Sequence, residues 1–85
     1  MTAKEAVTRA MTYAVELFTD AESIRLEELE RSGQAWHVTL SFQRKGTMGF
    51  LASLPSSRDY KIFTVRDQDG EVTSVKVREL SEQRA

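Results

Sequence analysis

Residues 60–78 read YKIFTVRDQDGEVTSVKVR, two runs of alternating apolar and polar residues joined by a short turn rich in Asp and Gly. β-Branched and aromatic side chains recur at every second position, as on one face of a pleated strand: Phe63, Val65, Val75 and Val77. The turn, residues 67–70, consists of residue types that tolerate a left-handed backbone or favour turns. The pattern predicts a β-hairpin with strands at about 59–66 and 71–79.

Two further strands are predicted upstream of this hairpin. Residues 35–43 alternate most regularly, with apolar Trp36, Val38, Leu40 and Phe42 on one face and polar His37, Thr39 and Ser41 on the other. Residues 23–30 alternate less well, because the apolar phase slips between Glu28 and Leu29, which indicates a bulge or an early strand end. Adjacent positions of a strand point to opposite faces, so Glu27 and Glu28 are not expected to form a paired acid/base site.

An amphipathic helix is predicted at the start of the chain, over about residues 3–19. Thr2 and Glu5 have the spacing of a capping box, in which each side chain accepts a hydrogen bond from the other residue's backbone N–H. Apolar residues then recur at steps of three and four, which predicts one buried stripe: Ala3, Val7, Ala10, Met11, Ala14, Leu17 and Phe18. The alanines favour close approach to a flat sheet, with Leu17 and Phe18 as anchors.

Together these elements predict an α+β fold of one domain over residues 1–85, with an N-terminal helix packed on a four-stranded antiparallel sheet in the order α-β-β-β-β. A helix covers only one face of such a sheet, so the other face is expected to contact water. A chain of 85 residues buries only about 60–65% of its unfolded surface, so stability is expected to be modest and pairing of two chains would add to it.

The predicted loop at residues 44–58, RKGTMGFLASLPSSR, is longer than ordinary hairpin connections and carries four apolar side chains, Met48, Phe50, Leu51 and Leu54. Gly46, Gly49 and Pro55 interrupt any regular element. Two interpretations remain open. Either Phe50 and Leu54 fold back on the core, or residues 46–54 dock on a partner with Arg44, Lys45 and Arg58 as a basic rim.

The sequence offers no constellation for catalysis or metal binding. It contains no cysteine, and its one histidine, His37, falls on the predicted solvent face without a nucleophile at related spacing. Asp67, Asp69 and Gly70 resemble part of a calcium loop, but the first and last ligand positions of such a loop would fall on Val65 and Lys76. We therefore predict a protein without enzymatic activity, cofactor or metal.

The charge balance and hydropathy of the chain disfavour nucleic acid as a partner and a membrane or secreted location. Twelve basic and thirteen acidic side chains leave a net charge of −1, which disfavours a protein that binds nucleic acid by neutralising phosphates. No segment approaches the ~20 apolar residues of a membrane span, and residues 1–11 do not resemble a secretory signal. The expected location is the cytoplasm.

The helix start TAKEAV, the strand AWHVTLSF and the run YKIFTVRDQDGEV resemble the PepSY family of small bacterial domains, over about residues 2–77 with the loop 44–58 as an insertion. The resemblance implies a helix followed by an antiparallel sheet. PepSY domains occur in peptidase propeptides and envelope proteins, with a proposed role in binding or inhibiting peptidases, and they have no catalytic residues. The resemblance thus implies a bacterial, noncatalytic binding domain.

Three functions are compatible with these patterns. The first is a protein-interaction or regulatory module that binds a protein or peptide through the exposed sheet face, where Tyr60, Ile62 and His37 are expected, or through the 46–54 loop. The second is a structural homodimer without a small-molecule ligand. The third, the least favoured, is a nucleic-acid-associated domain with a basic sheet face built from Lys61, Arg66, Lys76 and Arg78 beside Tyr60.

Overall fold

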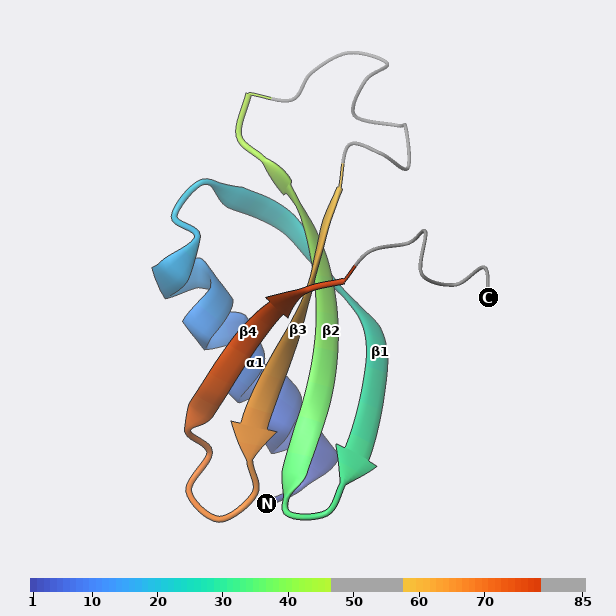
Figure 1. The fold of residues 1–85 in the computed structure, drawn as a ribbon. Coiled ribbons are helices and arrows are strands. Elements are labelled where there is room, and N and C mark those ends of the chain that lie inside the picture. The colour runs from blue at the N-terminus through green and yellow to red at the C-terminus, as the bar shows by residue number, and fades with distance from the viewer. Residues whose placement is uncertain (47–57, 79–85) are drawn as a thin grey trace, which may run out of the picture.

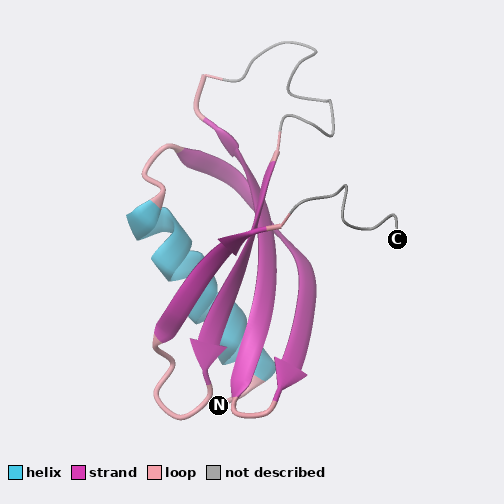
Figure 2. Ribbon diagram, in the orientation of Figure 1, coloured by secondary structure: helices cyan, strands magenta, loops and turns pink. Residues whose placement is uncertain are grey.

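A computed structural model describes residues 1–46 and 58–78 of the protein. The elements are α1 (Ala3–Leu17), β1 (Ala21–Ser32), β2 (Ala35–Arg44), β3 (Asp59–Arg66) and β4 (Val72–Val77). The strands form one antiparallel sheet in the order β1-β2-β3-β4, and α1 lies behind it in the view of Figure 1. The predicted α+β class and element order are confirmed (Figure 2). β1 is longer than predicted, and α1 ends two residues earlier.

α1 begins as predicted. The Thr2 hydroxyl accepts from the Glu5 N–H at 3.1 Å, and the Glu5 carboxylate accepts from the Thr2 N–H at 2.7 Å. The hydrogen bond from the Thr2 backbone holds the pKa of Glu5 below its usual value. At the other end the Phe18 N–H still bonds to the Ala14 carbonyl, at 2.8 Å. In the described residues no helix is long and apolar enough to cross a membrane.

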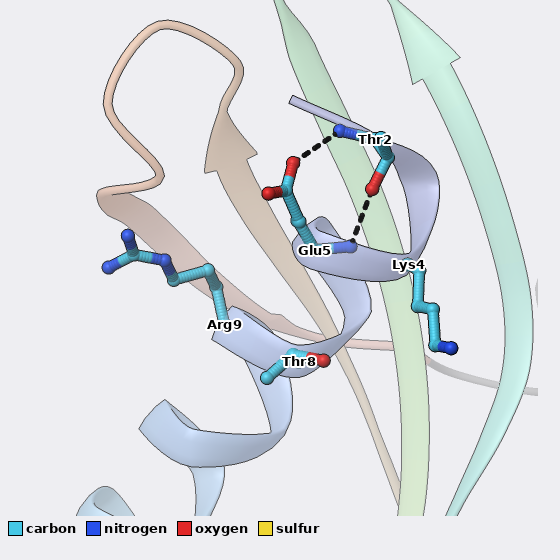
Figure 3. A pocket seen from close by; sticks show the side chains of 5 residues that line it. All are labelled: Thr2, Lys4, Glu5, Thr8 and Arg9. Atoms are coloured by element: carbon cyan, nitrogen blue, oxygen red, sulfur yellow. Dashed lines mark hydrogen bonds between the residues drawn. The ribbon is translucent and has the colours of Figure 1, made fainter.

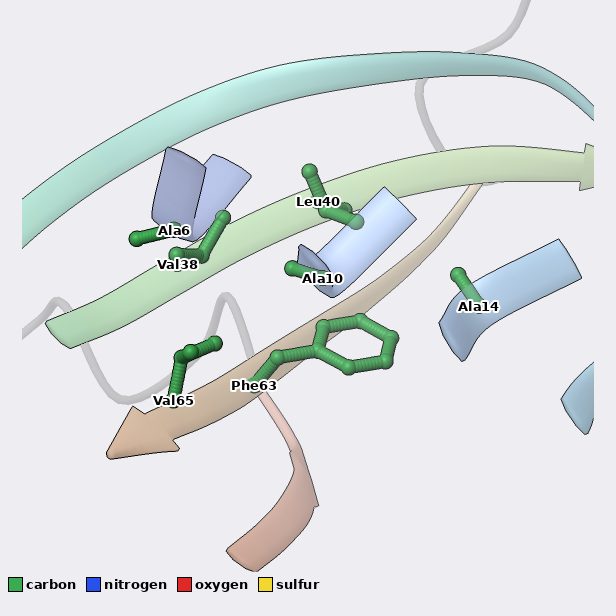
Figure 4. Packing of buried hydrophobic residues seen from close by; sticks show 7 residues of the cluster. All are labelled: Ala6, Ala10, Ala14, Val38, Leu40, Phe63 and Val65. Carbon is green, nitrogen blue, oxygen red and sulfur yellow. The ribbon is translucent and has the colours of Figure 1, made fainter. Parts of the chain in front are cut away.

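The core lies between one stripe of α1 and the two central strands. Ala6, Ala10 and Ala14 are fully buried, and Figure 4 shows them facing side chains of β2 and β3. These partners are fully buried too: Val38, Leu40, Phe63 and Val65. Tyr13 meets the Phe63 ring edge to face, with centroids 6.5 Å apart. Because alanine has so short a side chain, the helix backbone can lie close to the sheet.

Two residues expected in the core lie at its margin instead. Leu17 is 50% exposed and Val77 is 61% exposed, although Val77 does lie on the side of the sheet that carries α1. The alanine stripe covers mainly β2 and β3, whereas Val77 lies on the edge strand β4 and Leu17 is the last residue of α1. Helix periodicity and strand alternation give the direction of a side chain, but they do not show how far the covering layer extends.

The turn between β3 and β4 connects several parts of the chain. Of its residues only Gly70 has a positive φ, 74°, and a Cβ at this position would lie 2.9 Å from the Met1 side chain. Asp67 accepts hydrogen bonds from the Trp36 indole at 2.9 Å and from the N-terminal ammonium at 3.3 Å. Asp69 forms a bidentate pair with Arg66, at 3.0 and 2.7 Å. Both carboxylates thus bind groups of their own chain.

These hydrogen bonds predict a loss of stability in acid. The bonds from Arg66, and then the bond from the Glu71 backbone, lower the pKa of Asp69 from 3.8 to about 2, and the Trp36 indole lowers that of Asp67. A carboxylate whose pKa is lower in the folded state stabilises the fold above its unfolded pKa and loses this contribution as the pH falls. Urea unfolding should therefore show stability falling between about pH 4 and pH 2.

The variant Asp69→Asn isolates the part of this effect that belongs to one carboxylate. It should be less stable than the wild type at pH 6, and the difference should shrink as the pH falls toward 2, the folded-state pKa, where about half of the wild-type carboxylates are protonated. A difference in unfolding free energy that stays constant over this range would contradict the assigned role of the Arg66–Asp69 pair.

Candidate functional site

The face of the sheet opposite α1 carries a continuous set of polar and half-buried side chains. We call it the open face, and it comprises Arg25, Glu27, Glu28 and Glu30 on β1, His37, Thr39 and Ser41 on β2, Tyr60, Ile62 and Thr64 on β3, and Ser74 and Lys76 on β4. In Figure 1 this face is turned toward the viewer. Strand alternation places these residues opposite the buried stripe of Val38, Leu40, Phe63 and Val65.

The structure brings three of the predicted partner-binding residues together on this face. His37 on β2 pairs with Thr64 on β3, and two residues further along β2 Thr39 pairs with Ile62. Tyr60 follows opposite Ser41. His37, Tyr60 and Ile62 are each half-buried, so each keeps part of its surface accessible. The predicted loop residues Met48, Phe50, Leu51 and Leu54 lie outside the described residues.

A bulge in β1 changes where the carboxylates point. Leu26 pairs with Leu40 and Glu28 pairs with Thr39, so Glu27 is an extra residue between two successive pairs. Glu27 accepts a hydrogen bond from the Ser41 hydroxyl, and Glu28 lies beside Thr39, so both are on the open face. The expectation that they point to opposite faces is wrong, because strict alternation does not continue through a bulge.

A shallow depression of about 250 Å³ lies at the β1 side of the open face. Its lining comes from three strands: Glu28, Glu30, His37, Thr39 and Ile62. The two carboxylates come from β1, while Thr39 and Ile62 are cross-strand partners at its centre. The depression therefore combines negative charge with one aliphatic surface.

The groups around the depression differ in what they bind. The Glu28 carboxylate pairs with Arg78 at 3.2 Å, whereas the Glu30 carboxylate has no hydrogen-bond or ion-pair partner in residues 1–46 and 58–78. Thr39 is only 3% exposed, and its hydroxyl likewise has no hydrogen-bond partner within the described ranges. No fully buried side-chain oxygen in these ranges lacks a partner, so this hydroxyl opens into the depression. A carboxylate and a hydroxyl are thus available to a ligand.

His37 is oriented by a chain of hydroxyl groups on the neighbouring strands. The Ser74 hydroxyl donates to Thr64 Oγ1 at 3.0 Å, and Thr64 Oγ1 lies 3.4 Å from His37 Nδ1. Because Thr64 already accepts from Ser74, its own proton can be directed at Nδ1. In that arrangement Nε2 carries the imidazole proton and can donate a hydrogen bond to a ligand carbonyl.

A second polar network lies beside the depression, around the buried Ser41. Arg58 donates to the Ser41 hydroxyl at 2.9 Å and to the Ser41 carbonyl at 3.0 Å, and it also donates to the Ser23 carbonyl. The Ser41 hydroxyl in turn donates to Glu27 at 2.5 Å. Burial, assisted by the nearby charge of Arg25, lowers the pKa of Arg58 from its usual value. Arg58 therefore holds β1, β2 and β3 together at one end of the open face.

The other two residues of the predicted basic rim lie elsewhere. Arg44 donates to Asp20 and to Asp59, both at 2.7 Å, and its guanidinium stacks over Phe18 and Phe42 on the α1 side of the sheet. These hydrogen bonds hold the pKa of Arg44 above its usual value. Lys45 is exposed, and its backbone N–H bonds to the Asp20 carbonyl. The three rim residues thus do not form one basic surface.

The basic sheet face considered for nucleic acid is also divided. Lys61 pairs with Leu40 and Val77 on the α1 side, with its ammonium 5.5 Å from the centre of the Phe18 ring. Arg66 is held by Asp69 and Glu71, at 2.7 and 2.6 Å. Of the four cations considered for nucleic acid, Lys76 and Arg78 remain on the open face, and Arg78 is paired there with Glu28.

Two other hollows lie along α1. One of about 330 Å³ follows the outward side of its first turns, and Figure 3 shows Thr2 and Glu5 bound to each other there while Lys4 points away from them. A wider one of about 630 Å³ separates Tyr13 and Glu16 from the β3–β4 turn. Both hollows are lined mainly by exposed side chains of α1, whereas the depression on the open face is lined by three strands and includes the nearly buried Thr39, so the open face is the better candidate site.

The side chains that sequence reasoning missed are Glu28, Glu30 and Thr39. The alternation did place Thr39 on the solvent face, but it did not show that this side chain is nearly buried there, with its hydroxyl open to the depression and unpaired within residues 1–46 and 58–78. Comparison with known proteins adds no family: no family model, no curated protein and no solved structure matches the chain. The resemblance to PepSY domains stays a prediction.

Proposed function

We propose that the protein is a noncatalytic interaction module that binds a protein or peptide segment on its open face. The observation that carries this proposal is the depression around Thr39, where the hydroxyl of a nearly buried side chain and an accessible carboxylate lie beside the aliphatic surface of Ile62. Neither group has a partner within residues 1–46 and 58–78, and both are open to the hollow, so a ligand placed there can form hydrogen bonds with both. α1 covers the other face, which leaves this one for binding (Figure 2).

The size of the depression favours a segment of a macromolecule over a free small molecule. Sites for small ligands usually enclose about 300–1,000 Å³ and bury most of the ligand surface, whereas this hollow is shallow and about 250 Å³. It suits one or two side chains of a larger partner whose remaining contacts extend over the neighbouring strands.

Binding of short random peptides displayed on phage tests this function. Peptides selected against the full chain should shift the backbone amide signals of Thr39 and Ile62, and Ile62→Lys should weaken their binding by about tenfold or more because the new side chain fills the depression. The lysine stem keeps much of the aliphatic surface, so the fold should persist, as circular dichroism can verify.

The matched control is Val15→Lys, which likewise replaces a β-branched aliphatic side chain by lysine, on an exposed position of α1. It should leave peptide binding unchanged. If no selected peptide depends on Ile62, or if both variants weaken binding equally, the open face is not the binding site and the proposed function is contradicted.

A further inference from the structure

Resting on the proposed function, we infer that the depression receives the lysine or arginine side chain of a partner's peptide segment, and that Arg78 of the same chain competes with it. The first support is the charge of the lining. Among the described residues that line the depression, the carboxylates are Glu28 and Glu30 and there is no lysine or arginine, so an anionic group such as a phosphate would be repelled there. A cationic group is attracted.

The second support is that an arginine of the chain itself, Arg78, already binds Glu28 at the edge of the depression. The Arg78 backbone N–H bonds to the Tyr60 carbonyl just after the end of β4, and its guanidinium pairs with Glu28 on β1, the opposite edge strand of the sheet. The Arg78 side chain is 25% exposed, while that of Glu28 is 61% exposed. The open face therefore accommodates a guanidinium beside Glu28, while Glu30 has no partner within residues 1–46 and 58–78.

The third support is the match between the unpaired groups and a long basic side chain. Ile62 offers apolar surface for the methylene stem, Glu30 accepts from the cationic head, and the Thr39 hydroxyl can accept one further N–H. His37 Nε2 can donate to a backbone carbonyl of the segment. Exposed ion pairs contribute little by themselves, so these neighbouring contacts are needed for measurable binding, and a free amine lacks most of them.

The test uses the full chain and the peptides selected on it. These peptides should share a Lys or Arg at one fixed position, and replacing that residue by Gln should weaken binding by about five- to tenfold. Glu30→Gln should weaken binding of the original peptide to a similar extent and should have little further effect on the Gln peptide. Glu16→Gln removes an exposed carboxylate on α1 as the matched control and should change nothing.

Because Arg78 is inferred to compete with the peptide, removing its charge should strengthen peptide binding, whereas Glu30→Gln should weaken it. Arg78→Gln releases Glu28 and should tighten binding of the basic peptide by about two- to fivefold, an effect that vanishes in the background of Glu28→Gln. Weaker binding by Arg78→Gln would show that Arg78 belongs to the binding surface and would overturn the competition.

Other outcomes separate this inference from the function on which it rests. Peptides that bind through Ile62 but share no basic residue would overturn the inference and leave the interaction module intact. Spermidine binding as tightly as the peptides would show that the occupant is a small amine. Concentration-dependent dimerisation abolished by Lys76→Gln would show that a second copy of the chain occupies the face, since Lys76 is the exposed cross-strand partner of Ile62. Either result overturns the inference.

Discussion

Replacing Phe63 by alanine is expected to lower the free energy of unfolding by about 3–5 kcal/mol. Phe63 is fully buried at the centre of the sheet, where it contacts the alanine stripe of α1 and the edge of Tyr13 (Figure 4). Truncation removes the largest apolar group of β3 and leaves a cavity that Ala10 and Ala14 are too small to fill. Domains of this size have total free energies of unfolding near the low end of about 5–15 kcal/mol, so a substantial fraction of the variant molecules should be unfolded.

Urea unfolding followed by tryptophan fluorescence measures this loss, since Trp36 is the only tryptophan. Val77→Ala is the control, because Val77 also lies on the α1 side but is 61% exposed, and it should change stability by less than about 0.5 kcal/mol. A loss below about 1 kcal/mol for Phe63→Ala would contradict the packing of α1 against β3.

The second large effect is expected from enlarging a buried alanine. Ala10→Leu should lower the free energy of unfolding by about 1–3 kcal/mol, because Ala10 is fully buried and the added carbons would push α1 away from Leu40 and Phe63. Leucine and alanine have similar helix propensities, so the change tests packing and not helix formation. Thermal unfolding should show a drop of roughly 4–8 °C per kcal/mol.

Thr12→Leu provides the matched control, since Thr12 lies on the exposed side of α1. It adds a leucine to the same helix without a steric clash and should leave the unfolding temperature nearly unchanged. Equal stability of Ala10→Leu and wild type would mean that the helix does not lie close to the sheet at this point.

The two halves of the candidate site differ in how far the sequence predicts them. Regular alternation in residues 35–43 and 60–65 placed His37, Tyr60 and Ile62 on one face, and the structure has them there. The β1 half was predicted wrongly, because the extra residue Glu27 turns Glu28 to the same side. A slip in the apolar phase indicates a bulge, but it does not tell which residue is extra or where the next side chain points.

Local patterns by themselves determined the elements and their order: the capping box at Thr2, the amphipathic pattern of α1, the alternating strands and the turn at Gly70, although Ala6, fully buried in α1, was not among the predicted core residues. These features depend on residues near one another in the chain, so the spacing of residue types in the sequence predicts them. Only the tertiary structure decided that Arg78 reaches Glu28, that Thr39 is nearly buried with its hydroxyl open to the depression, and that Arg44 binds Asp20 and Asp59. These contacts join residues distant in the chain, and they depend on sheet register, twist and the extent of α1, which no local pattern specifies.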